Sequence, residues 1–164
     1  MSGLRIQIRK KADGSAALSC RRADGSVTWQ RQTGPQGRFF PLHDLTHYAV
    51  ETVLGYRRAF YGLIAEGWSF DDFGKPWPRG PLPAEAHAAE LIVGYLDAER
   101  ASGTRWSTDD FNRSAEAYGK GRAAPAFVLT EAQLGRIRAE RTRLFARWRE
   151  LAEAGILELD FPGG

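Results

Sequence analysis

The stretch Leu4-Arg5-Ile6-Gln7-Ile8-Arg9, with two later copies of Ala-Asp-Gly-Ser at 12–15 and 23–26, decides the N-terminal fold. Apolar and polar residues alternate along 4–9 with the period of two that is typical of a half-buried strand. Asp-Gly pairs reach positive φ easily and therefore suit the tight turns of hairpins. Residues 3–33 thus predict a three-stranded antiparallel meander.

The remainder of the chain predicts four or five helices within residues 41–154. Pro41 suits a first helical turn, where its missing N–H is not needed, and Gly55 is expected to end or kink the first helix. A second helix is expected to end at Glu66, and an aromatic loop rich in Pro and Gly follows over 67–83. Three more helices are expected, one over 84–100, one beginning at Ser107 and one from Thr130 to Gly155. A short strand over 157–161 comes last. The fold class is therefore α+β, with the last strand able to join the N-terminal sheet.

Length and composition limit the classes of protein that fit. A chain of 164 residues is long enough for one core and short for two, so we expect a single domain over 1–164. One cysteine excludes an internal disulfide and fits a cytoplasmic location. The longest apolar stretch is far below the roughly 20 residues that span a bilayer, so no membrane is expected.

The charge balance leaves a binding function open. The net charge is +3 and the pI about 9.2, and arginines occur in the meander (Arg5, Arg9 and Arg21) and along the last helix. A nucleic-acid or protein-binding module with a basic surface is therefore one hypothesis, although the sequence carries no nucleic-acid fingerprint.

The stretch from Pro41 to Glu51 contains two of the three histidines in the chain. Residues four apart lie on nearly the same side of a helix, so His43, His47 and Glu51 form a ladder of two imidazoles and a carboxylate. The ladder falls at the boundary between the apolar face and solvent. That is where a side chain lining a cleft must lie.

Two imidazoles at this spacing can bind one divalent metal ion. Zn²⁺ is our first expectation, with a carboxylate or a third imidazole completing three protein ligands, and Fe²⁺, Mn²⁺ or Ni²⁺ use the same residue types. Glu51 is one candidate for the third ligand, but it lies about 12 Å along the helix axis from His43, and the alternative is that it holds His47 by a hydrogen bond. His87 is the other candidate, with Glu90 three residues later on the same predicted helix in support.

The stretch His43-Asp44-Leu45-Thr46-His47 resembles the His-Glu-x-x-His helix of the zincin metallopeptidases, with aspartate in place of glutamate. The resemblance implies that His43 and His47 are zinc ligands and that Asp44 activates the metal-bound water. The adjacent pair His43-Asp44 is also similar to the His-Asp ligands of HD phosphohydrolases. Those enzymes use a further upstream histidine, and this chain has none before residue 43.

Three functional hypotheses follow. A metal-dependent hydrolase would use Asp44 or Glu51 as base on a small-molecule or peptide substrate, with Arg57, Arg58 or Arg141 as partners for an anionic one. A structural metal would instead tie the first helix to the third. Without a metal, His47 is a boundary residue hydrogen-bonded to Glu51, and the binding-module hypothesis comes first.

Overall fold

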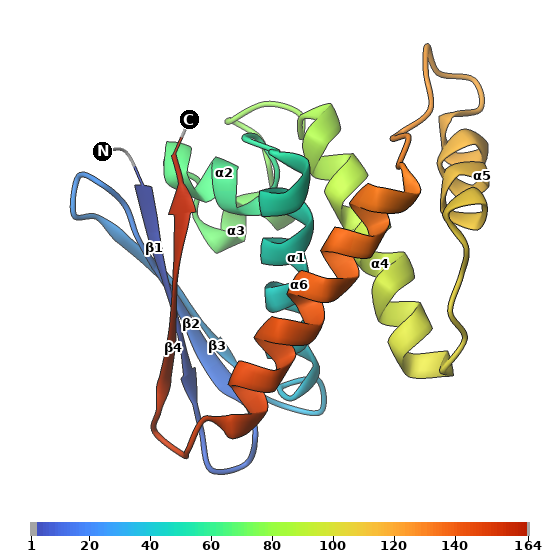
Figure 1. Cartoon of the computed structure of the whole chain (residues 1–164). Helices are drawn as coiled ribbons and strands as arrows, with labels where there is room; N and C mark the ends of the chain where they lie inside the picture. The colour runs from blue at the N-terminus through green and yellow to red at the C-terminus, as the bar shows by residue number, and fades with distance from the viewer. Residues whose placement is uncertain (1–2, 164) are drawn as a thin grey trace.

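A computed structural model describes residues 3–163 and confirms the α+β class (Figure 1). The elements are β1 (Gly3–Lys10), β2 (Ala16–Arg21), β3 (Val27–Gln32), α1 (Phe39–Leu54), α2 (Phe60–Glu66), α3 (Phe70–Gly74), α4 (Ala84–Ser102), α5 (Thr108–Gly119), α6 (Glu131–Glu150) and β4 (Ile156–Pro162). That the chain forms a single domain stays a prediction.

The four strands form one antiparallel sheet in the order β3-β2-β1-β4. The predicted meander is therefore present, and the C-terminal strand pairs with β1, as its alternation indicated. Ile6 lies opposite Cys20 on β2 and Leu159 on β4, and these side chains point into the core. The outer face is polar, and Arg5 there forms ion pairs with Glu158 and Asp160.

The two Asp-Gly turns form as predicted. Gly14 and Gly25 have φ values of 83° and 86°, which L side chains adopt only with strain. The preceding aspartates, Asp13 and Asp24, each accept hydrogen bonds from the serine two residues later. The repeated Ala-Asp-Gly-Ser stretch thus encodes the same turn twice.

Helix α1 lies between the sheet and α4, with α6 crossing it, while α5 lies farthest from the sheet (Figure 1). One core cluster joins the inner sheet face to α1 and α6, and a second joins α1 to α4, α5 and α6. The central position of α1 explains why its polar residues are buried. Among residues 3–163, no helix is both long and apolar enough to cross a membrane.

Several helix ends follow the predicted signals. Gly55 ends α1 in the left-handed conformation, with φ 69°. The helices expected from Ser107 and Thr130 each begin with a capping box, and Ser69 begins α3 in the same way.

Two predicted boundaries are wrong. The loop predicted over 67–83 contains the short helix α3, because Ser69 and Asp72 satisfy the first amide groups of that helix. The last helix ends at Glu150 rather than continuing to Gly155, and residues 151–155 turn the chain back into β4.

Gly62 in α2 lies where the backbone packs most closely. A Cβ built on this glycine would lie 1.8 Å from the carbonyl oxygen of Arg57. We expect Gly62→Ala to destabilise the protein by about 2–3 kcal/mol, because the backbone must shift to accept the methyl group. Urea unfolding measures the loss.

The matched control for this substitution is Gly94→Ala in the interior of α4. No atom lies within 4 Å of a Cβ built on Gly94. We expect this variant to gain about 0.5–1 kcal/mol from helix propensity. Equal stability of the two variants would contradict the close packing of α2.

Candidate metal centre

Three side chains from two helices come together beside the core. His43 and His47 project from α1 and Glu90 projects from α4, and one ligand atom from each lies within 4.8 Å of the others. The imidazole rings of His43 and His47 have centroids 4.9 Å apart and are nearly perpendicular. The His47 side chain is buried, that of His43 is 23% exposed, and that of Glu90 is 56% exposed. The triad therefore reaches from the interior to the surface.

Each imidazole is held through Nδ1 by a carboxylate. Nδ1 of His43 lies 2.6 Å from Oδ2 of Asp97, and Nδ1 of His47 lies 3.1 Å from Oε2 of Glu51. A carboxylate at Nδ1 fixes the ring orientation and leaves Nε2 for a metal, an arrangement common at histidine-ligated sites. Nε2 of His47 indeed faces Glu90, with Oε1 at 3.1 Å.

Glu51, which contacts the His47 ring, is itself fixed by burial and by a hydrogen bond. Its side chain is completely buried, and Oε1 accepts a hydrogen bond from the backbone N–H of Tyr61 at 2.9 Å. Helix α2 therefore positions Glu51, and Glu51 positions His47. Glu51 was expected either to bind the metal or to hold His47 by a hydrogen bond. Its contact with Nδ1 of His47 is the second of these.

The charges around His47 favour its protonated form when no metal is bound. Burial opposes the imidazolium, but the hydrogen bonds and negative charges of Glu51 and Glu90 outweigh burial and raise the pKa of His47 to about 10. Burial alone would raise the pKa of Glu90, yet the contact with His47 lowers it. A metal ion at this position must therefore displace a proton from His47.

Asp44 lies buried beside the triad and faces the sheet. Its Oδ2 accepts a hydrogen bond from the side-chain amide of Gln32 at the end of β3, and its backbone carbonyl accepts one from the Tyr61 hydroxyl at 2.9 Å. Burial raises the pKa of Asp44 to about 6, against the opposing effects of Gln32 and the two imidazoles. Asp44 is thus a titratable group near neutrality in contact with β3.

The structure brings together some of the residues singled out in the sequence and leaves others aside. Among residues 3–163, the one group suited to hold a metal contains His43, His47 and Glu90, so His87 and Glu51 lie outside it. The sequence reasoning missed Asp97 altogether. Glu90 and Asp97 are seven residues apart, two turns of one helix, and this spacing was the signal that could have revealed Asp97.

No protein-family profile, curated protein or solved structure matches this chain. The resemblance to zincins therefore rests on residues 43–47 alone, and no family assignment supports it. The geometry of the triad is what points to a function.

Proposed function

We propose that this protein binds one divalent metal ion through His43, His47 and Glu90. The observation that carries the proposal is the convergence of three donors whose imidazoles are already oriented by Asp97 and Glu51. A tetrahedral Zn²⁺ with bonds of about 2.0–2.1 Å holds its donors about 3.3 Å apart. The spacing of His47 and Glu90 is close to that value, so Zn²⁺ is our first choice, and Fe²⁺, Mn²⁺ or Ni²⁺ suit the same donors.

The decisive experiment compares two substitutions on α4. Untagged protein is reconstituted with Zn²⁺ at pH 8, gel-filtered and analysed by ICP-MS, beside Glu90→Gln and His87→Ala. We expect one metal ion per chain in the parent and in His87→Ala, and well below one in Glu90→Gln after gel filtration, because a neutral amide is a poorer ligand than a carboxylate. Glu90 is half exposed, so its substitution should leave the fold intact.

Two results would count against the triad. If the reconstituted parent holds no metal, then His43, His47 and Glu90 form an ion-pair network only. Metal that is lost from His87→Ala but kept by Glu90→Gln would instead make His87 the third ligand.

The finer proposal is metal-dependent hydrolysis. Three protein ligands would leave a fourth position for water, and Glu90 lies on the exposed side of the triad. A bound metal supplies Lewis-acid activation of that water, lowering its pKa toward about 7. In this proposal Glu51 orients His47, and Asp44 is the candidate base as the carboxyl next to His43 in the chain; its Oδ2 accepts the hydrogen bond from Gln32, so its side chain must turn away from β3 to reach the water.

Hydrolysis is tested with chromogenic carboxylic and phosphate esters and with labelled peptides. Loss of turnover in Asp44→Asn with full metal content would support Asp44 as base. If no substrate class is turned over, and chelation instead lowers the melting temperature, the metal is structural and links α1 to α4.

A further inference from the structure

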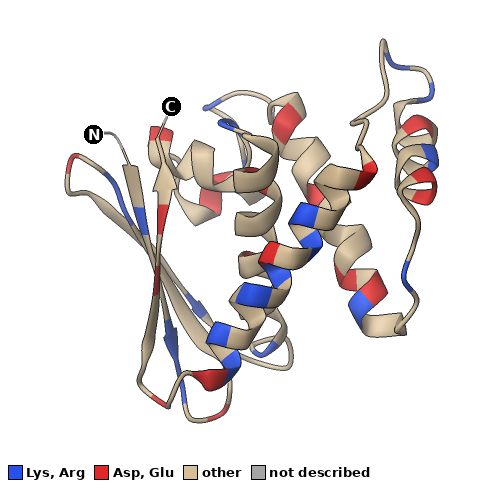
Figure 2. Ribbon diagram, in the orientation of Figure 1, with Lys and Arg blue, Asp and Glu red and all other residues tan. Residues whose placement is uncertain are grey.

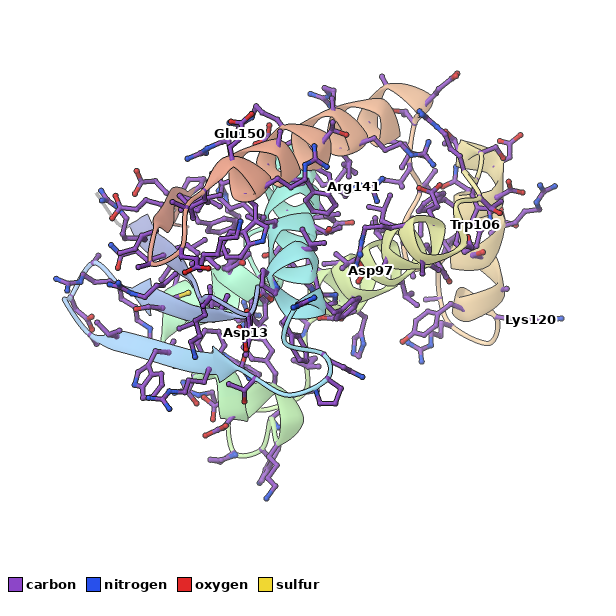
Figure 3. The ribbon with its side chains drawn as sticks, turned by 90° about the horizontal axis from the view of Figure 1, so that it is seen from below. Asp13, Asp97, Trp106, Lys120, Arg141 and Glu150 are labelled. Carbon is purple, nitrogen blue, oxygen red and sulfur yellow. The ribbon has the colours of Figure 1, made fainter. Side chains whose placement is uncertain are left out.

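A second feature lies between α4 and α6, beyond Asp97. The residues that line a cavity of about 410 Å³ there include five arginines, Arg100, Arg105, Arg138, Arg141 and Arg149, and one acidic residue, Glu99. We call it the arginine cleft. Figure 2 shows the basic residues along α6, and Figure 3 labels Arg141 on α6 and Asp97 on α4 where the two helices face each other.

The carboxylate of Glu99, the one acidic residue in the cleft lining, already accepts hydrogen bonds from neighbouring groups. Oε1 of Glu99 accepts hydrogen bonds from Nη2 of Arg138 and from the backbone N–H of Trp106, while Nη2 of Arg141 stays 3.9 Å from Oε2. Asp97, just outside the lining, contacts Nδ1 of His43 through Oδ2, and its Oδ1 lies 3.8 Å from Nη2 of Arg100, so two carboxylates face five arginines. The five arginines therefore retain an excess of positive charge.

Two of the five arginines, Arg138 and Arg141, lie largely out of solvent and retain unused donors. The side chains of Arg138 and Arg141 are only 13% and 15% exposed. Nε of Arg138 is buried without a hydrogen-bond partner, and Arg141 makes one hydrogen bond, from Nη1 to the carbonyl of Leu96 at 3.1 Å. Because burial without a full counter-charge disfavours the cation, the pKa of Arg141 is lowered. Leaving guanidinium donors unpaired is unfavourable, and an oxyanion in the cleft would satisfy those of Arg141, whereas the Nε of Arg138 is itself buried from a ligand.

The rim of the cleft carries two more cations. Within the part of the chain that the structure describes, neither Arg105 nor Arg149 forms an ion pair, and both are exposed. Their charges add to the positive potential at the opening. The adjoining cavity of about 760 Å³ shares Arg105 and Arg138, and its lining also includes the neutral Ser107 and Asn112 and the acidic Asp109 and Glu131. It offers room for the remainder of a ligand whose anionic group lies among the arginines.

We propose that the arginine cleft binds the phosphate group of a small phosphorylated molecule. Planar guanidinium groups match the oxygens of phosphate in paired hydrogen bonds, and several of them suit a dianion. The cleft volume lies within the range of small-molecule sites, whereas a nucleic acid needs cations spread along its backbone. This inference goes beyond metal binding and does not require a metal at His43, His47 and Glu90.

The test uses metal-free protein, so that its result is independent of the metal centre. Chelator-treated protein in a phosphate-free buffer is titrated calorimetrically with inorganic phosphate and with pyrophosphate. We expect saturable binding that Arg141→Gln weakens about tenfold or more and that Arg105→Gln and Arg149→Gln each weaken about threefold. The two rim variants are exposed and unpaired, so they decide the question even if Arg141→Gln does not fold.

The matched control is Arg136→Gln, which removes the same charge from α6 at an exposed position that lines a different cavity. Its affinity for phosphate should stay within about twofold of the parent. The proposal is overturned if neither anion binds saturably, or if Arg136→Gln weakens binding as much as the rim variants. It is also overturned if a single-stranded oligonucleotide binds and phosphate and pyrophosphate do not.

Discussion

His47→Ala is expected to abolish metal binding and to lower the free energy of unfolding of the metal-free protein by about 3–5 kcal/mol. The substitution removes a ligand and also the positive partner of Glu51, whose side chain is completely buried. The backbone N–H of Tyr61 would remain as a hydrogen-bond donor to that carboxylate, without neutralising its charge. Metal content by ICP-MS and urea unfolding in the presence of chelator measure the two effects separately.

His43→Ala separates the loss of metal from the loss of stability. It removes a ligand too, but its side chain is 23% exposed and it leaves the contact between His47 and Glu51 unchanged. We therefore expect His43→Ala to lose metal while losing much less stability than His47→Ala. A His47→Ala protein that keeps parental stability would contradict the buried ion pair, and one that keeps its metal would contradict the triad.

The local parts of this fold were predictable because short-range physics determines them. The alternation along 4–9 and the two Asp-Gly turns set the meander, and Gly55 ended the first helix where its conformational freedom is needed. Helix α3 was missed because Pro and Gly dominate residues 67–83, and one capping box was enough to form a short helix among them.

The candidate site was predictable only along one helix. The spacing of His43 and His47 is a local property of α1, and so is the contact from His47 to Glu51. The choice of Glu90 over His87 depends on the rotation of α4 against α1, which packing decides. That packing also brings Asp97 to His43, and the placement of α6 beside α4 brings Arg141 toward Glu99; these contacts join residues 54 and 42 positions apart in the chain.

The second large effect concerns Asp44 and depends on pH. The pKa of Asp44 is raised from 3.8 to about 6 in the folded protein, so the folded state binds more protons than the unfolded state between these values. Stability is therefore favoured below about pH 4 and falls as the pH rises through 6. The difference of about two pKa units corresponds to roughly 3 kcal/mol of destabilisation at pH 8.

Asp44→Asn removes this penalty and keeps an oxygen that can accept the hydrogen bond from Gln32. We expect the variant to be more stable than the parent by up to about 3 kcal/mol at pH 8, and the difference to disappear near pH 4. Urea unfolding at intervals between pH 4 and 8 measures it. A constant difference across that range would show that Asp44 does not titrate as its burial requires.

Asp110→Asn provides a control of opposite sign. Hydrogen bonds from Ser107, with Arg113 nearby, lower the pKa of Asp110 to about 2. Its charged form therefore stabilises the fold at neutral pH, and that contribution is lost as the pH falls through about 2. Asp110→Asn should accordingly be less stable than the parent at pH 7, whereas Asp44→Asn should be more stable. Both substitutions replace an aspartate with asparagine. Opposite effects on stability at neutral pH would therefore show that the environment of each carboxylate is the cause.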